Sequence, residues 1–401
     1  MKKWNPILLL VIAQSFVLLF TSCSTSWTES LQNGSVEERE FSKNIPMEVV
    51  MGVIIVPVQI NGKTYRFLFD TGAISSISKE IQEELGFQTV SQGHIKDSDN
   101  QRTKVIYVNV DSLLINEVSF YNQTCFVGDF KANPVLRCLE LDGILGSNVM
   151  RYCNWEIDYE KEEISFSNQA VENSSDTTYI IPFRTDRQYN ILINLKTADR
   201  SIQNVKVDYG SNGSLSIPNK AFNTLLEDGI ITKVTYQKGV SQSGITGKVS
   251  TIKDAIAVLD SLYYEDLMIK EVRLASGGKG LLGKSILARY IVDIDWDEQL
   301  LHLTPQKSYS HELKTTGLGI GYSEKKGTYV QTVIDGSSAD ENGIQPHMKI
   351  IRIGDIHFNT QDDFCEYIHQ ASKSDQIDVE LVDQNGENIS VTLYNQPYNF
   401  N

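Results

Sequence analysis

Residues 65–73 read YRFLFDTGA, an alternating apolar run that ends at Asp70. Such alternation predicts a β-strand that carries the carboxyl group of Asp70 into a tight turn. A degraded copy, VKVDYGS, occupies residues 205–211 and places Asp208 at the matching position. Because Asp-x-Gly is ordinary turn chemistry, one such segment is a weak signal. Two copies are a strong signal, since two carboxylates brought face to face can activate a water molecule.

Other features also occur twice, at nearly constant offsets of 135–137 residues. They are an Ile-Pro pair, an apolar strand, an apolar-Leu-Gly segment and a later strand. The paired segments are 45–46 and 181–182, 56–60 and 191–195, 142–147 and 279–284, and 155–159 and 292–296. A constant spacing across separate features predicts that one structural unit has been duplicated.

Composition limits the classes of protein that fit. The chain has 401 residues, 41% of them hydrophobic and 22% charged, which is typical of two or three folded domains. Its net charge of −15 argues against nucleic acid as a partner, because phosphate binding needs a basic surface.

The N-terminus has the pattern of an export signal. Two lysines precede an apolar stretch, residues 7–20, that is short for a membrane span. The small residues that precede Cys23 resemble a bacterial lipoprotein signal, which implies cleavage after residue 22 and a lipid anchor on Cys23. An ordinary secretory signal with an incidental cysteine is the alternative. We expect a cell-envelope protein that faces the periplasm, with a flexible tether over residues 23–44.

The remaining cysteines fit an exported protein. Cys125, Cys138 and Cys153 lie in the first repeat, and Cys365 lies near the C-terminus. We expect one disulfide within the first repeat, and the sequence leaves its three pairings open. No metal site is expected, because no Cys-x-x-Cys pair or nearby histidine completes a ligand set.

Short alternating runs broken by Gly, Asn and Asp predict β-hairpins in both repeats. Short helices are expected at residues 79–85 and 147–153 in the first repeat and at 219–227 and 285–290 in the second. The fold class we predict is mainly β. Two pseudo-twofold-related β lobes, residues 45–170 and 179–305, should form a cleft between them.

On these motifs, residues 45–305 resemble the clan AA aspartic proteases of the retropepsin and pepsin type. The resemblance implies that Asp70 and Asp208 form the catalytic dyad and that Gly72 and Gly210 let the loops pass beneath the carboxylates. It also implies flaps that close over substrate at residues 93–105 and 239–249, for which ordinary surface hairpins are the alternative. No cofactor is implied. Because both halves lie in one chain, the cleft needs no dimer, and a monomer is expected.

One position departs from that family. The residue after each Asp is ordinarily Thr or Ser, whose hydroxyl bonds to the opposite loop. Thr71 fits, but the hydroxyl of Tyr209 lies at the far end of a ring and cannot take that place. An unsatisfied buried partner would cost about 1–3 kcal/mol, so the departure puts catalytic competence in question and leaves the fold unaffected.

Residues 311–396 resemble a PDZ domain, an α+β module. In that family a glycine-rich loop, here Gly317-Leu318-Gly319-Ile320, binds the carboxylate of a peptide C-terminus, and the peptide adds a strand to the sheet. The alternative is a packing module that braces the lobes without binding anything.

Two functions of different classes follow. The first is an aspartic endopeptidase of the cell envelope, anchored to a membrane through its lipid and acting on peptide or protein substrates. The second is a catalytically inactive protein of the same fold that binds peptides in its cleft or in the PDZ-like groove.

Overall fold

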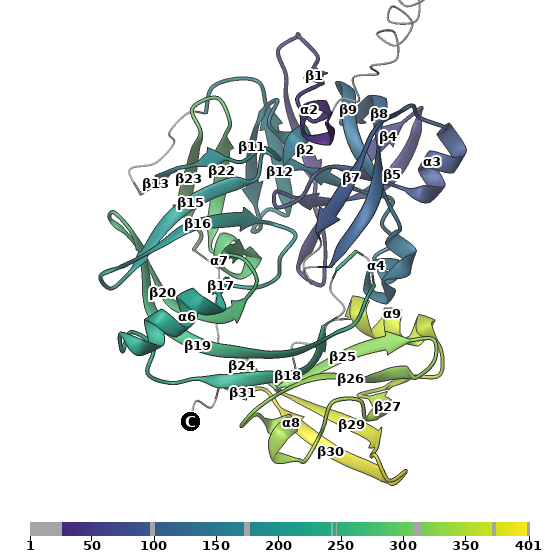
Figure 1. Ribbon diagram of the computed structural model, residues 1–401, viewed down its shortest axis with the longest axis vertical. Helices are drawn as coiled ribbons and strands as arrows, with labels where there is room; N and C mark the ends of the chain where they lie inside the picture. The colour runs from purple at the N-terminus through teal and green to yellow at the C-terminus, as the bar shows by residue number, and fades with distance from the viewer. Residues whose placement is uncertain are drawn as a thin grey trace, which may run out of the picture.

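The computed structural model describes residues 26–96, 101–171, 177–241, 244–245, 247–307, 314–370 and 374–398. The predicted signal, residues 1–22, and Cys23 lie outside these ranges. Within them, no helix has the length and apolar character needed to cross a membrane. The structure is 54% strand and 14% helix, and two β lobes are followed by a smaller C-terminal domain (Figure 1). The predicted mainly-β, two-lobe fold is confirmed.

The first lobe is built around a long mixed sheet in the order β1-β9-β6-β10-β5-β4-β8-β7, with β3 paired to β4. Its elements are α2 (Trp27–Ser30), β1 (Ser35–Val36), β2 (Ser42–Pro46), β3 (Glu48–Val50), β4 (Val53–Ile60), β5 (Lys63–Asp70), β6 (Ser76–Ser78), α3 (Lys79–Leu85), β7 (Thr89–Lys96), β8 (Arg102–Ile115), β9 (Val118–Gly128), the 3-10 helix η2 (Phe130–Ala132), α4 (Pro134–Cys138), β10 (Gly143–Gly146), α5 (Ser147–Met150), β11 (Asn154–Asp158) and β12 (Glu163–Ser167).

The second lobe repeats the central part of this arrangement. Its elements are β13 (Tyr179–Pro182), β14 (Arg184–Thr185), β15 (Ile191–Thr197), β16 (Arg200–Asp208), β17 (Leu215–Pro218), α6 (Asn219–Glu227), β18 (Thr235–Ser241), β19 (Ser250–Tyr264), β20 (Leu267–Gly277), β21 (Leu281–Gly283), α7 (Lys284–Leu287), β22 (Tyr290–Asp295) and β23 (Leu300–Pro305). The four helices expected from the sequence correspond to α3, α5, α6 and α7, of which α5 and α7 are shorter than expected.

A six-stranded sheet joins the two lobes, in the order β13-β23-β22-β11-β12-β2. Its central pair is β11 with β22, one strand from each lobe, in antiparallel register with Glu156 opposite Asp293. Trp155 and Ile157 lie on the opposite face of β11 from Glu156, and both are almost fully buried. This shared sheet fixes one lobe relative to the other.

The segment expected to be a flexible tether is folded over its described part, which corrects that expectation for residues 26–44. The Trp27 ring stacks on Tyr107 with centroids 5.5 Å apart, and Leu31 is fully buried. The hydroxyl of Thr124 donates to the Ser30 carbonyl at 2.7 Å. These apolar contacts hold the segment on the first lobe, because releasing it would expose Leu31 to water.

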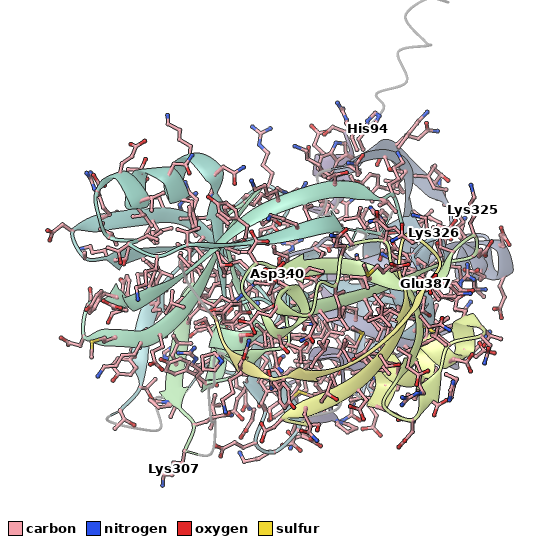
Figure 2. The ribbon with its side chains drawn as sticks, turned by 90° about the horizontal axis from the view of Figure 1, so that it is seen from below. His94, Lys307, Lys325, Lys326, Asp340 and Glu387 are labelled. Atoms are coloured by element: carbon pink, nitrogen blue, oxygen red, sulfur yellow. A yellow bond between two sulfur atoms is a disulfide. The ribbon has the colours of Figure 1, made fainter. Side chains whose placement is uncertain are left out.

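The C-terminal domain has its own apolar core around Val330, Ile350, Phe364 and Leu381. Its elements are β24 (Lys314–Thr315), β25 (Leu318–Ser323), β26 (Gly327–Ile334), α8 (Ser338–Glu341), β27 (Lys349–Ile353), β28 (Ile356–His357), α9 (Gln361–Gln370), β29 (Gln376–Val382), β30 (Asn388–Tyr394) and β31 (Gln396–Pro397). From below, Figure 2 shows this domain in front, with Lys325 and Lys326 of the β25–β26 turn near its edge.

Two links attach the C-terminal domain to the lobes. Strand β18 of the second lobe pairs antiparallel with β26, so that Gln237 lies opposite Ile334 (Figure 1). A disulfide joins Cys138 of α4 to Cys365 of α9. The expectation of a disulfide within the first repeat is therefore wrong: Cys125 and Cys153 are free and buried, and the folded chain brings Cys138 to a partner outside the repeat.

Candidate active site

Asp70 ends strand β5, where the sheet brings a second segment beneath the following turn. Strand β10 runs parallel to β5, with Gly146 opposite Asp70. A Cβ on Gly146 would lie 2.5 Å from the Ala73 carbonyl oxygen, so this close crossing of two chain segments requires a glycine. Phe67 and Phe69 on the buried side of β5 anchor the turn in the core.

Asp208 ends strand β16 in the equivalent position. Strand β21 runs parallel to β16 and places Gly283 opposite Asp208. A Cβ on Gly283 would lie 2.4 Å from the Gly213 carbonyl oxygen. In both lobes, the glycine of the apolar-Leu-Gly motif thus allows two chain segments to cross closely beneath the aspartate turn.

The two aspartate turns meet, and each carboxyl group lies against the glycine of the opposite turn. A Cβ built on Gly72 would be 2.3 Å from Asp208 Oδ2, and one built on Gly210 would be 2.4 Å from Asp70 Cγ. The four residues predicted to form the centre of the site are therefore brought together. The arrangement is reciprocal, as a pseudo-twofold axis between the lobes demands.

The electrostatics of the pair favour one shared proton. Burial and then the negative charge of Asp208 raise the pKa of Asp70 to about 7, and a hydrogen bond between the two carboxyls adds to the rise. Lys206 and the Gly72 N–H, which donates to Asp70 Oδ1 at 2.7 Å, oppose it. Asp208 is 7% exposed and Asp70 is partly exposed. Asp70 therefore keeps a proton well into the neutral range.

Thr71 locks the two turns together as the sequence predicted. Its hydroxyl donates to the Val207 carbonyl at 2.8 Å and accepts from the Tyr209 N–H at 3.2 Å. Thr71 is fully buried, so both bonds are shielded from water.

The side chain of Tyr209 does not form the equivalent hydrogen bond to the opposite turn. Its ring is fully buried and packs edge-on against Phe69 and parallel to Tyr159. Its hydroxyl has no hydrogen-bond partner among the residues that the structure describes. Tyr209 therefore acts as a packing residue beneath the dyad, while the bonds of Thr71 hold the turns.

Sequence reasoning missed Lys206. Its ammonium group lies 3.3 Å from Asp208 Oδ2 and also donates to the Gly72 carbonyl. A signal was available, because residues 206 and 208 share one face of a strand and the first repeat has Leu68 at the matching place. Nothing in that pattern showed that the ammonium group turns toward the dyad.

Comparison with known proteins supports this reading of the site. Residues 56–149 match the family model described as aspartyl protease. This stretch of the first lobe is therefore similar to an aspartyl protease domain. The matched stretch includes Asp70, Thr71, Gly72 and Gly146, whereas the placement of Asp208 rests on the geometry above. A search of curated proteins found no match.

Both predicted flaps contact other parts of the molecule over their described residues. In the first, Gly93 of β7 packs against the rings of Trp27 and Tyr107. In the second, Gln237 to Gly239 of β18 pair with β26, and Asn133 Nδ2 donates to the Gly244 carbonyl at 2.9 Å. The second hairpin therefore bridges from its own lobe to the first lobe, near α4 (Figure 1).

The predicted peptide-binding loop lies in the C-terminal domain, far in sequence from the dyad. The Gly317 N–H donates to Thr315 Oγ1 at 3.0 Å and the Leu318 N–H to Thr316 Oγ1 at 3.4 Å. Gly319 and Ile320 lie in β25, which pairs with β26. Two N–H groups of this loop are thus already bonded within the loop.

Helix α4 of the first lobe covers the space next to β25 and α9. Val135 and Cys138 pack on the core of the C-terminal domain. Arg137 Nη1 donates to Gln361 Oε1 at 2.7 Å, and His369 Nε2 bonds the Cys138 carbonyl at 2.8 Å. The first lobe and the C-terminal domain are therefore in direct contact at this surface.

Within the described part of the chain, no group of three or more His, Cys, Asp and Glu side chains could hold a metal ion. The ionisable groups described at the site are the carboxyls of Asp70 and Asp208 and the ammonium group of Lys206.

Proposed function

We propose that this protein is an aspartic endopeptidase of the cell envelope that hydrolyses peptide bonds with a water molecule activated by Asp70 and Asp208. The observation that carries the proposal is the reciprocal contact of each carboxyl with the glycine of the opposite turn. An arrangement that tolerates no Cβ at either glycine leaves the carboxyls little freedom to separate.

The proposed reaction needs one proton on the pair. The charged carboxylate takes a proton from the bound water, whose oxygen attacks the scissile carbonyl carbon. The protonated carboxyl donates to the oxyanion that develops there. No covalent intermediate forms, because water is the nucleophile. A pKa of about 7 for Asp70 implies that activity falls as pH rises above neutral.

The envelope location and the membrane anchor rest on the sequence around Cys23. Lipid on this cysteine would hold the lobes at a membrane surface, with the remainder of the chain outside the bilayer. The test is fractionation of cells that produce the Cys23→Ser variant: the protein should move from the membrane to the soluble fraction.

For the C-terminal domain we propose a PDZ-like module whose first role is to brace the protease lobes. Support comes from α4, which covers the space between β25 and α9, and from the loop N–H groups that bond to Thr315 and Thr316. Peptide binding at this groove would first have to displace α4. Binding of a fluorescent C-terminal peptide by the intact protein would contradict the brace role.

The alternative is a catalytically inactive protein that binds peptides, and Tyr209 is the observation in its favour. An assay of the chain from residue 24 onward on an unfolded protein, between pH 3 and pH 8, separates the two. Cleavage should occur in the wild type and be lost in both Asp70→Asn and Asp208→Asn. Equal cleavage by these variants would refute the dyad, and an inactive wild type that still binds the unfolded protein would establish the alternative.

A further inference from the structure

The dyad has a cationic neighbour that is held in place from two directions. Lys206 lies on β16, two residues before Asp208 and on the same face of the strand. Its Nζ is 3.3 Å from Asp208 Oδ2 and donates to the Gly72 carbonyl of the opposite turn. The side chain is 15% exposed, so this ion pair is largely shielded from solvent.

This lysine breaks the symmetry of an otherwise repeated framework. In the first lobe Leu68 lies opposite Ile144 of β10, and in the second Lys206 lies opposite Leu281 of β21. The registers therefore make Leu68 the structural equivalent of Lys206. Leu68 is 8% exposed and packs in an apolar cluster with Ile55 and Ile144. The cation thus acts on one carboxyl of the pair more than on the other.

We propose that Lys206 is a positioning residue that holds Asp208 as the charged carboxylate, so that the shared proton resides on Asp70. The inference deepens the proposed function and rests on it for its catalytic consequence. It assigns the roles within the dyad: Asp208 removes the proton from water, and Asp70 donates to the oxyanion.

The physical basis is the competition between burial and neighbouring charge. Burial disfavours both carboxylates, but an opposite charge within about 4–6 Å lowers the pKa of a carboxyl by roughly 1–3 units. Lys206 contacts Asp208 directly. The negative charge that it stabilises is then one of the causes of the raised pKa of Asp70.

One more lysine interacts electrostatically with Asp208 and Lys206. Asp208 and Lys206 are the charged residues that influence Asp70. Lys279, which precedes β21, interacts electrostatically with Lys206, Lys96, Asp186 and Asp208. Burial is the largest cause of its lowered pKa, and the charge of Lys206 is the next.

The consequence is a wider pH range in which exactly one carboxyl is charged. Without the lysine, the negative charge of the pair loses its cationic neighbour, and the acidic limb of the activity profile should move to higher pH. The basic limb, set by loss of the proton from Asp70, should remain near neutral or rise.

The experiment compares three variants of the chain from residue 24 onward. Lys206→Met keeps an unbranched apolar side chain and removes the charge, while Lys206→Arg keeps the charge. Lys196→Met is the matched control, because Lys196 is an exposed lysine on the neighbouring strand β15. We expect Lys206→Met to raise the midpoint of the acidic limb of kcat/KM by about 1 pH unit or more. Lys206→Arg and Lys196→Met should keep the wild-type profile.

A second measurement decides the inference without activity. The ¹³Cγ signals of labelled aspartate are followed against pH in Asp70→Asn with and without Lys206→Met, and the signal lost in Asp208→Asn assigns Asp208. We expect the titration midpoint of Asp208 to rise by about 1 unit or more when Lys206 is removed. An unchanged midpoint overturns the role of Lys206. An inactive wild type with the expected NMR shift would refute the proteolysis alone.

Discussion

Cys138 and Cys365 are 227 residues apart in the sequence and form a disulfide between the first lobe and the C-terminal domain. The bond lies where α4 meets α9, beside the hydrogen bond from His369 to the Cys138 carbonyl. It closes a loop that contains the whole second lobe. The same second lobe is bound to the C-terminal domain through β18 and β26. The three folded parts are thus connected in a ring.

Removing this disulfide should destabilise the protein markedly. A long closed loop restricts the unfolded chain, and loss of a native disulfide typically costs about 2–5 kcal/mol. We expect the Cys138→Ser/Cys365→Ser double variant to lose free energy of unfolding within that range, as measured by denaturant titration. Wild type treated with a reductant is the control and should match the double variant. A double variant as stable as the oxidised wild type would contradict the link.

Adding a methyl group at either dyad glycine should abolish efficient catalysis. A Cβ at Gly72 or Gly210 would overlap the carboxyl of Asp208 or Asp70 and push it aside. A displacement of about 1 Å in a catalytic group costs on the order of 100-fold in rate. We expect Gly72→Ala and Gly210→Ala to lower kcat/KM by at least that factor. Gly278→Ala, where a Cβ meets nothing within 4 Å, should leave kcat/KM unchanged.

Replacing Tyr209 with phenylalanine should stabilise the protein and preserve its activity. The Tyr209 hydroxyl is buried and without a partner among the described residues. Removing such a group relieves a desolvation penalty of about 1–3 kcal/mol. We expect a higher free energy of unfolding for Tyr209→Phe. Tyr152→Phe is the contrasting control, because the Tyr152 hydroxyl donates to the Asn33 carbonyl at 2.9 Å and its removal should destabilise.

The carboxyl pair of Asp293 and Glu156, in the sheet that joins the two lobes, should make the protein less stable at alkaline pH. The pKa of Asp293 is raised to about 7. Burial is the largest cause, followed by the negative charge of Glu156 and by a hydrogen bond to it. A raised pKa means that the folded state holds the proton more tightly than the unfolded state. The associated stability is present below about pH 4 and is lost as pH rises through about 7.

The variant Asp293→Asn tests this pH dependence. One unit of pKa shift corresponds to about 1.4 kcal/mol. The variant should therefore gain at least about 1 kcal/mol over wild type at pH 8, and less at pH 5. Asp199→Asn, a change in an exposed turn, should show no such difference between the two pH values. A constant offset for Asp293→Asn across pH would refute the prediction.

Much of the site could be predicted because its signals lie within single strands. Alternation along β5 gave the buried face of Phe67 and Phe69, and the repeated Asp-x-Gly turns located Asp70 and Asp208. The apolar-Leu-Gly segments were found as part of the repeat, and the structure places their glycines, Gly146 and Gly283, at the crossings beneath the aspartate turns. Each of these features depends on a few neighbouring residues, because strand alternation and turn formation are set by residues adjacent in the sequence.

The errors occurred where distant surfaces meet. The described residues of the expected tether are folded because Leu31 and Trp27 find an apolar surface on the first lobe. Cys138 pairs with Cys365 because α4 packs on α9, a contact between segments with no shared pattern. Composition and spacing report the tendencies of a segment and cannot report which surface will cover it.

By itself, then, the sequence determined the duplicated β lobes and the two aspartate turns, since strand alternation and glycine chemistry act within a few residues. Tertiary structure alone decided that Lys206 reaches Asp208 and Gly72 and that the C-terminal domain is attached at α4 and β18. It also decided that the buried Tyr209 hydroxyl has no hydrogen-bond partner in the part of the chain that the structure describes. These features depend on the relative placement of segments that lie far apart in the sequence, which is fixed when their apolar faces are buried together.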